Sequence, residues 1–274
     1  LKLQPGLCTP WAANAVRVLD PLGRVTEAPM RRPEAHWVPV PDMGALPRAW
    51  AEPLIEQERL LLEHSVQRIG RDAADGGRWR LSCETRDGPH EFGGFDELML
   101  ALPAAQAADL LRASSLAPGF IERLDQVRVA PCWTLMVAFP NAQQAGQLGP
   151  QWNAPSSPHH RMAWISRESP KPGREAIERW TVQASAGWST EHLEDDPQRI
   201  EAKLIKGFAE VTGIRAEPGH AQVHRWRHAK THVPLGQSHL LDRQLGLGLC
   251  GDWCLGHRVE DAFVSGLELA LGAL

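Results

Sequence analysis

Tyrosine is absent from this sequence of 274 residues, although eleven tryptophans are present. Without a phenol, any proton transfer must use His, Asp, Glu, Lys, Cys or water. No apolar run approaches the length that a transmembrane helix needs, and no signal peptide is visible. A net charge of -4 gives no indication of nucleic acid or of an anionic membrane surface as a partner. We therefore expect a globular protein that binds neither.

Cysteine is scarce and odd in number. The sequence has five dispersed cysteines, which favours reduced thiols and a cytoplasmic location over a disulfide framework. No metal site is expected, because His228 and His232 have ligand spacing only on a helix, whereas their segment is predicted as strand and loop. A serine nucleophile is not indicated either, because no Gly-x-Ser-x-Gly turn occurs.

The most informative stretch is the last one, residues 245–266. It is predicted to form a short buried strand, a turn at Gly251-Asp252 and a helix that begins near Arg258. Because this strand runs into a helix through glycines, unpaired backbone N–H groups are expected at the helix start, where they suit an anionic or electron-rich ligand. An ordinary strand-turn-helix connection, with Asp252 capping the turn and Glu260 balancing the helix dipole, would give the same pattern.

A longer pattern in this stretch resembles a known family. Leu249-Cys-Gly-Asp-Trp-Cys254, followed by Arg258-Val-Glu-x-Ala-x-x-Ser-Gly266, is similar to the C-terminal flavin signature of FAD-dependent oxidoreductases, in particular the bacterial renalase-like branch of the flavin-containing amine oxidase group. The resemblance implies that the Gly251-Asp252 turn approaches FAD and that Asp252 bonds its ribityl or pyrophosphate part. It also implies that Arg258, Val259 and Glu260 lie at the pyrimidine edge of the isoalloxazine. Where the family usually has glycine, this chain has Asp261.

Further segments carry the same resemblance. In the predicted strand 64–69, the backbone of Val66 would contact adenine, although burial in the core is an equally good interpretation. The predicted strand 95–103 ends in Ala-Leu-Pro103, and the resemblance implies that this turn lies against the cofactor. Trp226, in the predicted strand 224–229, would face the substrate beside the flavin ring. A core tryptophan between exposed arginines is the alternative for Trp226.

The GxGxxG fingerprint that binds the pyrophosphate in such enzymes is not found in the sequence. The resemblance then implies a chain that lacks the N-terminal dinucleotide-binding segment. We expect an α/β and α+β fold, with an incomplete Rossmann-like FAD-binding domain and an antiparallel-sheet substrate domain. Residues 1–42 would form a hairpin segment of the substrate domain, 43–115 part of the FAD-binding domain, 116–242 the substrate domain, and 243–274 the last strand and helix of the FAD-binding domain.

The implied activity is an FAD-dependent oxidation of a small molecule. Hydride would pass from an amine or from reduced nicotinamide, NAD(P)H, to flavin N5, and the protein would position the substrate and tune the ring. The sequence identifies no catalytic acid or base and leaves the oligomeric state open. The alternative hypothesis is a non-catalytic fragment or partner-binding remnant of this fold without bound FAD.

Overall fold

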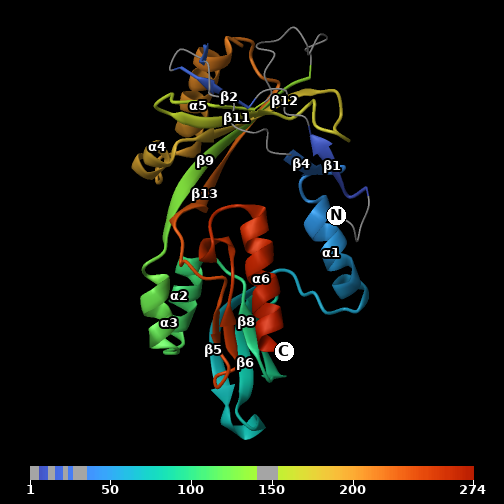
Figure 1. Ribbon diagram of the computed structural model, residues 1–274, viewed down its shortest axis with the longest axis vertical. Helices are drawn as coiled ribbons and strands as arrows, with labels where there is room; N and C mark the ends of the chain where they lie inside the picture. The colour runs from blue at the N-terminus through green and yellow to red at the C-terminus, as the bar shows by residue number, and fades with distance from the viewer. Residues whose placement is uncertain (1–5, 12–15, 21–23, 27–35, 141–153) are drawn as a thin grey trace. The chain divides into compact units, whose positions relative to one another are not determined.

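The chain consists of two compact units. The computed structural model describes residues 6–11, 16–20, 24–26, 36–140 and 154–274 (Figure 1). Unit 1 is formed by residues 1–60 and 131–227, and unit 2 by residues 61–130 and 228–274. The boundaries at 130 and 227 fall within two long strands, β9 (Arg128–Phe139) and β13 (His220–Val233). Within the described ranges, no helix is both long and apolar enough to cross a membrane.

Unit 1 is built on a seven-stranded sheet. Its strand order is β13-β9-β12-β11-β10-β2-β3, where β9, β12 and β11 pair antiparallel and β10 pairs with β2 in parallel. A separate two-stranded antiparallel sheet joins β1 to β4. The elements of this unit not yet given are β1 (Cys8–Trp11), β2 (Val16–Leu19), β3 (Val25–Thr26), β4 (His36–Pro39), α1 (Ala45–Glu56), β10 (Ala154–Ser156), β11 (Met162–Arg167), β12 (Glu178–Ala184), α4 (Ala186–Glu191) and α5 (Pro197–Thr212).

Helix α5 packs against the unit 1 sheet along one apolar face. The helix starts where the Asp196 carboxylate accepts hydrogen bonds from the first backbone N–H groups, and it ends at Gly213, whose φ of 74° is left-handed. The Phe208 ring lies 5.6 Å from the Trp180 ring and 6.2 Å from the Phe139 ring. In the sequence, the spacing of Ile200, Leu204, Phe208 and Val211 along one face predicts this helix, and all four side chains are buried in the structure.

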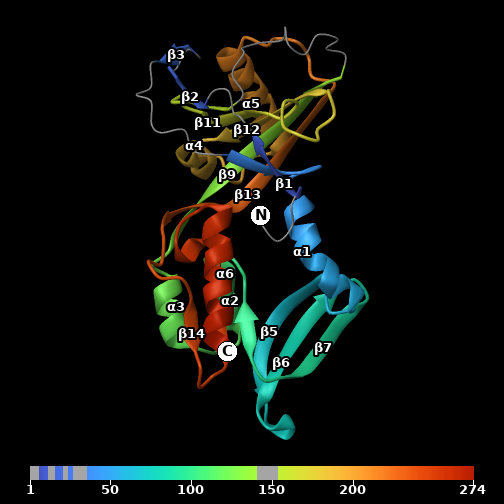
Figure 2. The same ribbon diagram turned by 45° about the vertical axis from the view of Figure 1, so that its right-hand side comes forward.

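Unit 2 contains two small sheets and three helices. The antiparallel sheet is made of β5 (His64–Asp72), β6 (Arg78–Thr85) and β7 (Gly88–Phe95) (Figure 2). The other sheet has the order β14-β15-β8, in which β15 (Leu247–Leu249) pairs in parallel with β8 (Leu98–Leu100) and antiparallel with β14 (Leu240–Asp242). The helices are α2 (Ala104–Ala113), α3 (Pro118–Leu124) and α6 (Val259–Ala273), and short 3-10 turns cover Ala73–Asp75 and Asp252–Cys254.

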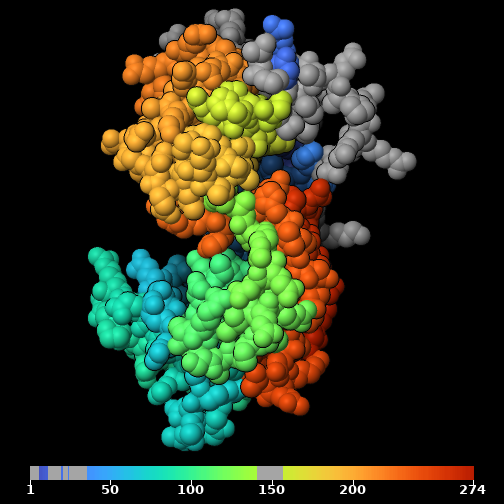
Figure 3. Space-filling model, turned by 90° about the vertical axis from the view of Figure 1, so that its left-hand side faces the viewer, coloured from blue at the N-terminus to red at the C-terminus, as the bar shows by residue number. Residues whose placement is uncertain are grey.

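Specific contacts join these elements into one core. Figure 3 shows α2 and α3, in green, between the strands of β5 to β7 and the C-terminal segment. The Trp79 indole of β6 is fully buried, and its Nε1 donates a hydrogen bond of 3.1 Å to the Gly246 carbonyl before β15. Helix α6 approaches β15 closely at Gly248, where a Cβ would lie 2.6 Å from Leu269 Cδ1. A side chain at Gly248 would also meet Met99 Sδ of β8 at 2.4 Å, so it would displace both neighbouring side chains.

The two units divide at residues 60, 130 and 227, whereas the sequence placed the expected domain boundaries at 42, 115 and 242. The assignment of the units to FAD-binding and substrate domains stays a prediction. Val66 is not a core residue: its exposure is 37%, and a register shift between Val66 and Arg68 interrupts the alternation until Ile69, which is buried.

The sequence around Pro21-Leu-Gly23 predicts a hairpin of two short strands, and β2 and β3 do pair antiparallel, although the turn at 21–23 lies outside the described residues. The Asp75-Gly-Gly77 turn predicts that the strands on either side of it pair, and β5 and β6 pair antiparallel across it. The alanine-rich segment after Pro103 predicts a helix that extends through Leu111, and this helix is α2. The helix predicted near Arg258 is α6.

Unit 1 contains a buried ion pair that we expect to be critical for stability. Arg167 donates two hydrogen bonds of 2.8 Å to the Glu178 carboxylate, and the Glu178 side chain is fully buried. We expect Glu178→Ala to lower the free energy of unfolding by about 3–5 kcal/mol, because a buried guanidinium loses its counter-charge.

The measurement is urea denaturation of the two proteins. Glu91→Ala is the matched control, since its pair with Arg80 is exposed on both sides, and it should change the free energy of unfolding far less. Equal losses in the two variants would contradict the prediction.

Candidate functional site

The carboxyl ends of β8 and β15 meet at a cavity of about 350 Å³. In open sheets with parallel strands, ligands usually bind beyond these ends of the strands. Every residue that lines the cavity belongs to unit 2. The lining residues are Ala101, Leu102, Pro103, Ala104, Val129, His228, Thr231, Cys250, Gly251, Asp252, Trp253, Ala262 and Gly266.

The turn at Gly251 and Asp252 is held rigidly against the rest of the unit. Gly251 N–H donates a hydrogen bond of 3.0 Å to the Ser265 hydroxyl of α6, and that hydroxyl donates one of 2.5 Å to the Ser238 carbonyl. On the other side, Trp253 Nε1 donates to the Leu102 carbonyl at 2.9 Å. The turn is therefore tied both to α6 and to the segment that follows β8.

Few polar side chains line the cavity, and two of them have no hydrogen-bond partner among the described residues. Thr231 is only 5% exposed, and its Oγ1 has no hydrogen-bond partner in the part of the chain that the structure describes. Likewise, no described residue forms a hydrogen bond or ion pair with the Asp252 carboxylate. His228 is the third polar side chain, and neither Lys nor Arg lines the cavity. The cavity wall is thus mainly apolar, and its one acidic side chain, Asp252, is not balanced by a Lys or Arg.

The five cysteines have free thiols, and two of them lie at or behind this wall. Cys250 lines the cavity, whereas Cys254 is fully buried in the same turn. Burial raises the pKa of the Cys250 thiol, and it raises the pKa of the Cys254 thiol to about 11. Both side chains are therefore neutral thiols at physiological pH, and neither has the exposed thiolate that a nucleophile or redox centre needs.

The structure brings together some of the residues predicted from the sequence. Pro103, Gly251 and Asp252 all line the cavity. Val66 lies in β5 and is not among the lining residues. Trp226 belongs to unit 1, is 52% exposed and packs against the His224 ring at 4.2 Å, so the alternative of a core tryptophan is wrong.

The start of α6 is capped in part: the amides just before the helix are paired, whereas the Val259 and Glu260 N–H groups have no hydrogen-bond partner among the described residues. The Asp261 carboxylate accepts hydrogen bonds from the backbone N–H groups of His257 at 2.9 Å and Arg258 at 2.8 Å. These amides are therefore capped by the chain itself, as in a capping box. Arg258, Val259 and Glu260 are exposed at this end of the helix, and the α6 residues that line the cavity are Ala262 and Gly266.

Sequence reasoning missed Thr231, His228 and Ser265. Nothing in a single sequence marks a threonine in a strand as buried without a partner. Ser265 was noticed only as part of the flavin signature, whereas its hydroxyl connects the turn to α6. His228 was considered only as a metal ligand, a role that the sequence did not support, and its place in the wall of this cavity was not predicted.

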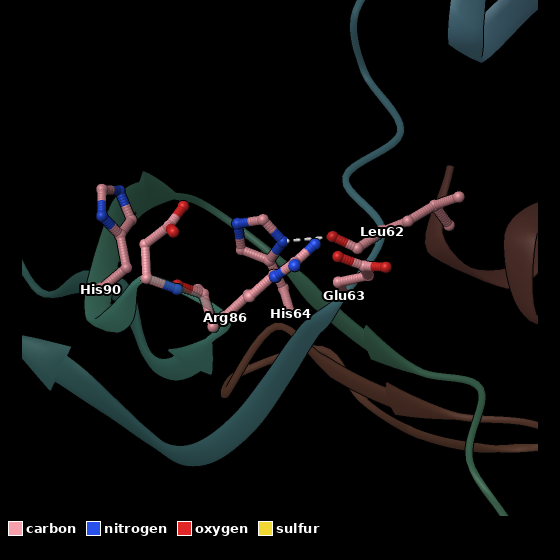
Figure 4. A pocket seen from close by; sticks show the side chains of 7 residues that line it. Leu62, Glu63, His64, Arg86 and His90 are labelled. Atoms are coloured by element: carbon pink, nitrogen blue, oxygen red, sulfur yellow. Dashed lines mark hydrogen bonds between the residues drawn. The ribbon is translucent and has the colours of Figure 1, made fainter.

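A second hollow, of about 240 Å³, lies at one end of the β5–β6–β7 sheet. Figure 4 shows the Arg86 side chain extending toward His64, whose Nδ1 lies 2.6 Å from the Leu62 carbonyl oxygen. Leu62, Glu63, Arg86, Asp87 and His90 are all exposed around it. This hollow contains none of the predicted site residues, and none of its polar groups is both buried and unpaired.

Comparison with known proteins supports the fold. No family model matches the sequence. A protein from Exiguobacterium sp. 255-15 that is assigned as a protoporphyrinogen oxidase matches 86% of this chain with a TM-score of 0.63 and 16% sequence identity. The cyclohexylamine oxidase from Brevibacterium oxydans IH-35A matches 84% with a TM-score of 0.58 and 13% identity. In both cases the chain spans about half, 52%, of the solved structure.

Similarity at this level of identity shows a shared fold and nothing finer. The chain has the fold of these oxidases, so the expected mixed α/β and α+β class, with antiparallel sheets, is confirmed.

A first prediction concerns Gly251. A Cβ at this position would lie 2.3 Å from Trp253 Nε1, so Gly251→Ala must displace the indole that holds the turn. We expect a loss of about 1–3 kcal/mol in the free energy of unfolding. The control is Gly266→Ala in the same cavity wall, where a Cβ meets nothing within 4 Å. Because alanine favours a helix over glycine by up to about 1 kcal/mol, this variant should be as stable as wild type or more so in chemical denaturation.

A second prediction concerns pH. Because the pKa of Cys254 is raised to about 11 in the folded protein, the folded state keeps a proton that the unfolded state loses above about pH 8.5. The stability from this group is complete below that pH and is lost as the pH rises to about 11. We expect the urea midpoint to fall less between pH 8 and pH 10.5 in Cys254→Ala than in wild type. Parallel curves for the two proteins would contradict this.

Proposed function

We propose that this protein is an FAD-dependent oxidoreductase of the renalase-like amine oxidase type and that its cavity in unit 2 holds part of FAD. The observation that carries the proposal is the convergence of Pro103, Gly251 and Asp252, all expected at the cofactor, on one cavity with unpaired polar groups. Its volume, about 350 Å³, is within the range of ligand sites, and its mainly apolar lining suits a flat aromatic ring with a few polar edges.

The charge of the cavity wall decides which part of the cofactor it can hold. Asp252 is an anionic group without a partner in the described chain, and the cavity has no cationic lining residue. A pyrophosphate beside this carboxylate would be repelled, whereas sugar or ribityl hydroxyls would donate hydrogen bonds to it. We therefore place the ribityl and ring portion here and assign Asp252 to the hydroxyl groups.

Bound FAD would supply the chemistry by accepting hydride at N5 from a small amine or from NAD(P)H. The residues of this chain would bind and orient it: Asp252 by accepting hydrogen bonds, the Pro103 turn by shape, and the apolar wall by excluding water. We also propose that the ring edge is contacted by Arg258, Val259 and Glu260. The adenine would contact Val66, and the substrate would contact Trp226. A cytoplasmic location belongs to the same proposal.

The test is FAD binding by the whole chain, followed by flavin absorbance and fluorescence quenching. We expect yellow protein, and we expect Asp252→Ala to weaken binding about tenfold or more, because a hydrogen bond to a charged group is worth ~1.5–3 kcal/mol. Asp87→Ala is the matched control, since Asp87 lines the other hollow, and it should bind FAD like wild type. Colourless protein that does not bind added FAD would overturn the proposal and favour a non-catalytic remnant of the fold. If Asp87→Ala weakens binding instead, the site is the other hollow.

A further inference from the structure

The hydroxyl group of Thr231 is the most unusual group in the cavity. Oγ1 is fully buried and has no hydrogen-bond partner among the described residues, while the residue as a whole is 5% exposed and lines the cavity. A buried hydroxyl without a partner destabilises a protein, and nearly all such groups in folded proteins are paired with protein or with an ordered molecule.

Thr212, another buried threonine of the described chain, does not share this property. The Thr212 hydroxyl donates a hydrogen bond of 2.7 Å to the Phe208 carbonyl and accepts one of 3.1 Å from Ile214 N–H. A threonine could be replaced at position 231 by valine, which has the same shape and no hydroxyl. The polar atom is therefore a feature that the packing of the strand does not require.

We propose that Thr231 is a positioning residue whose hydroxyl forms a hydrogen bond with the polar edge of the ligand in this cavity. The inference rests on the proposed function, in which that ligand is the ring portion of FAD. The surroundings favour such a bond, because the neighbouring lining residues are mainly apolar. A ligand atom that reaches Oγ1 gives up its own bound water, and few other polar groups compete with it for the hydroxyl. Thr231 is on β13, whereas Asp252 is in the turn after β15, so the two groups would fix the ligand from different elements.

The experiment compares Thr231→Val with wild type in two measurements, thermal unfolding and FAD binding. We expect the variant to be more stable and to bind FAD more weakly. In the absence of FAD, the variant should have a higher thermal unfolding midpoint, by about 2 °C, because an unpaired buried hydroxyl is removed. In FAD titrations, the same variant should bind about three- to tenfold more weakly, because the bond to the ligand is lost. Thr231→Ser, which keeps the hydroxyl, should bind FAD within about twofold of wild type.

Thr212→Val is the control for the stability measurement. Its hydroxyl is paired, so this variant should have a lower midpoint than wild type. If Thr231→Val also lowers the midpoint, the hydroxyl has a partner in the protein and the inference is overturned. If wild type and Thr231→Val bind FAD equally, the inference fails while the proposed function stands. If wild type binds no FAD, both fail.

Discussion

The hydroxyl group of Ser265 connects the parts of unit 2 on which the cavity depends. It accepts a hydrogen bond from Gly251 N–H and donates one to the Ser238 carbonyl, and the side chain is fully buried. One group on α6 thereby fixes the turn after β15 and the segment before β14. The parallel pairing of β15 with β8 then sets the Pro103 turn beside the Asp252 turn. The cavity is a consequence of these constraints, since neither turn has regular strand pairing of its own to fix its position.

Packing alone explains why glycine occupies its positions near the cavity, without reference to any ligand. Gly248 permits contact between β15 and α6, and Gly251 makes room for the Trp253 indole. The resemblance to a flavin signature therefore includes residues that packing alone would select. Packing does not explain the Thr231 hydroxyl and the Asp252 carboxylate, for which the described residues provide no hydrogen-bond partner. For this reason the functional argument depends on these side chains and not on the glycines, although the glycines make the motif recognisable.

The sequence predicted the elements well and the site in part, for physical reasons that particular residues illustrate. Helix α5 was predictable because Ile200, Leu204 and Phe208 all face one core. Pro103 and Asp252 were named through the resemblance to the flavin signature, and both line the cavity. Thr231 was not found, because a missing hydrogen bond is a property of its neighbours in space. The same holds for Val66, where a register shift changed which side chain is buried. Asp261 was noticed as a departure from glycine, but its role as a cap depends on the exact course of the backbone at His257.

Helix α6 shows where periodicity stops being informative. The apolar residues at helical spacing correctly predicted a helix, yet Val259, Phe263, Leu267 and Leu271 are between 46% and 71% exposed in the described structure. The residues that α6 buries are Ser265 and Leu269, on another face. Close approach at Gly248 and the Ser265 hydrogen bonds select that face, and both are contacts with segments distant in sequence. A 3.6-residue period therefore determines that a helix forms, whereas the partners of the helix determine which of its faces becomes interior.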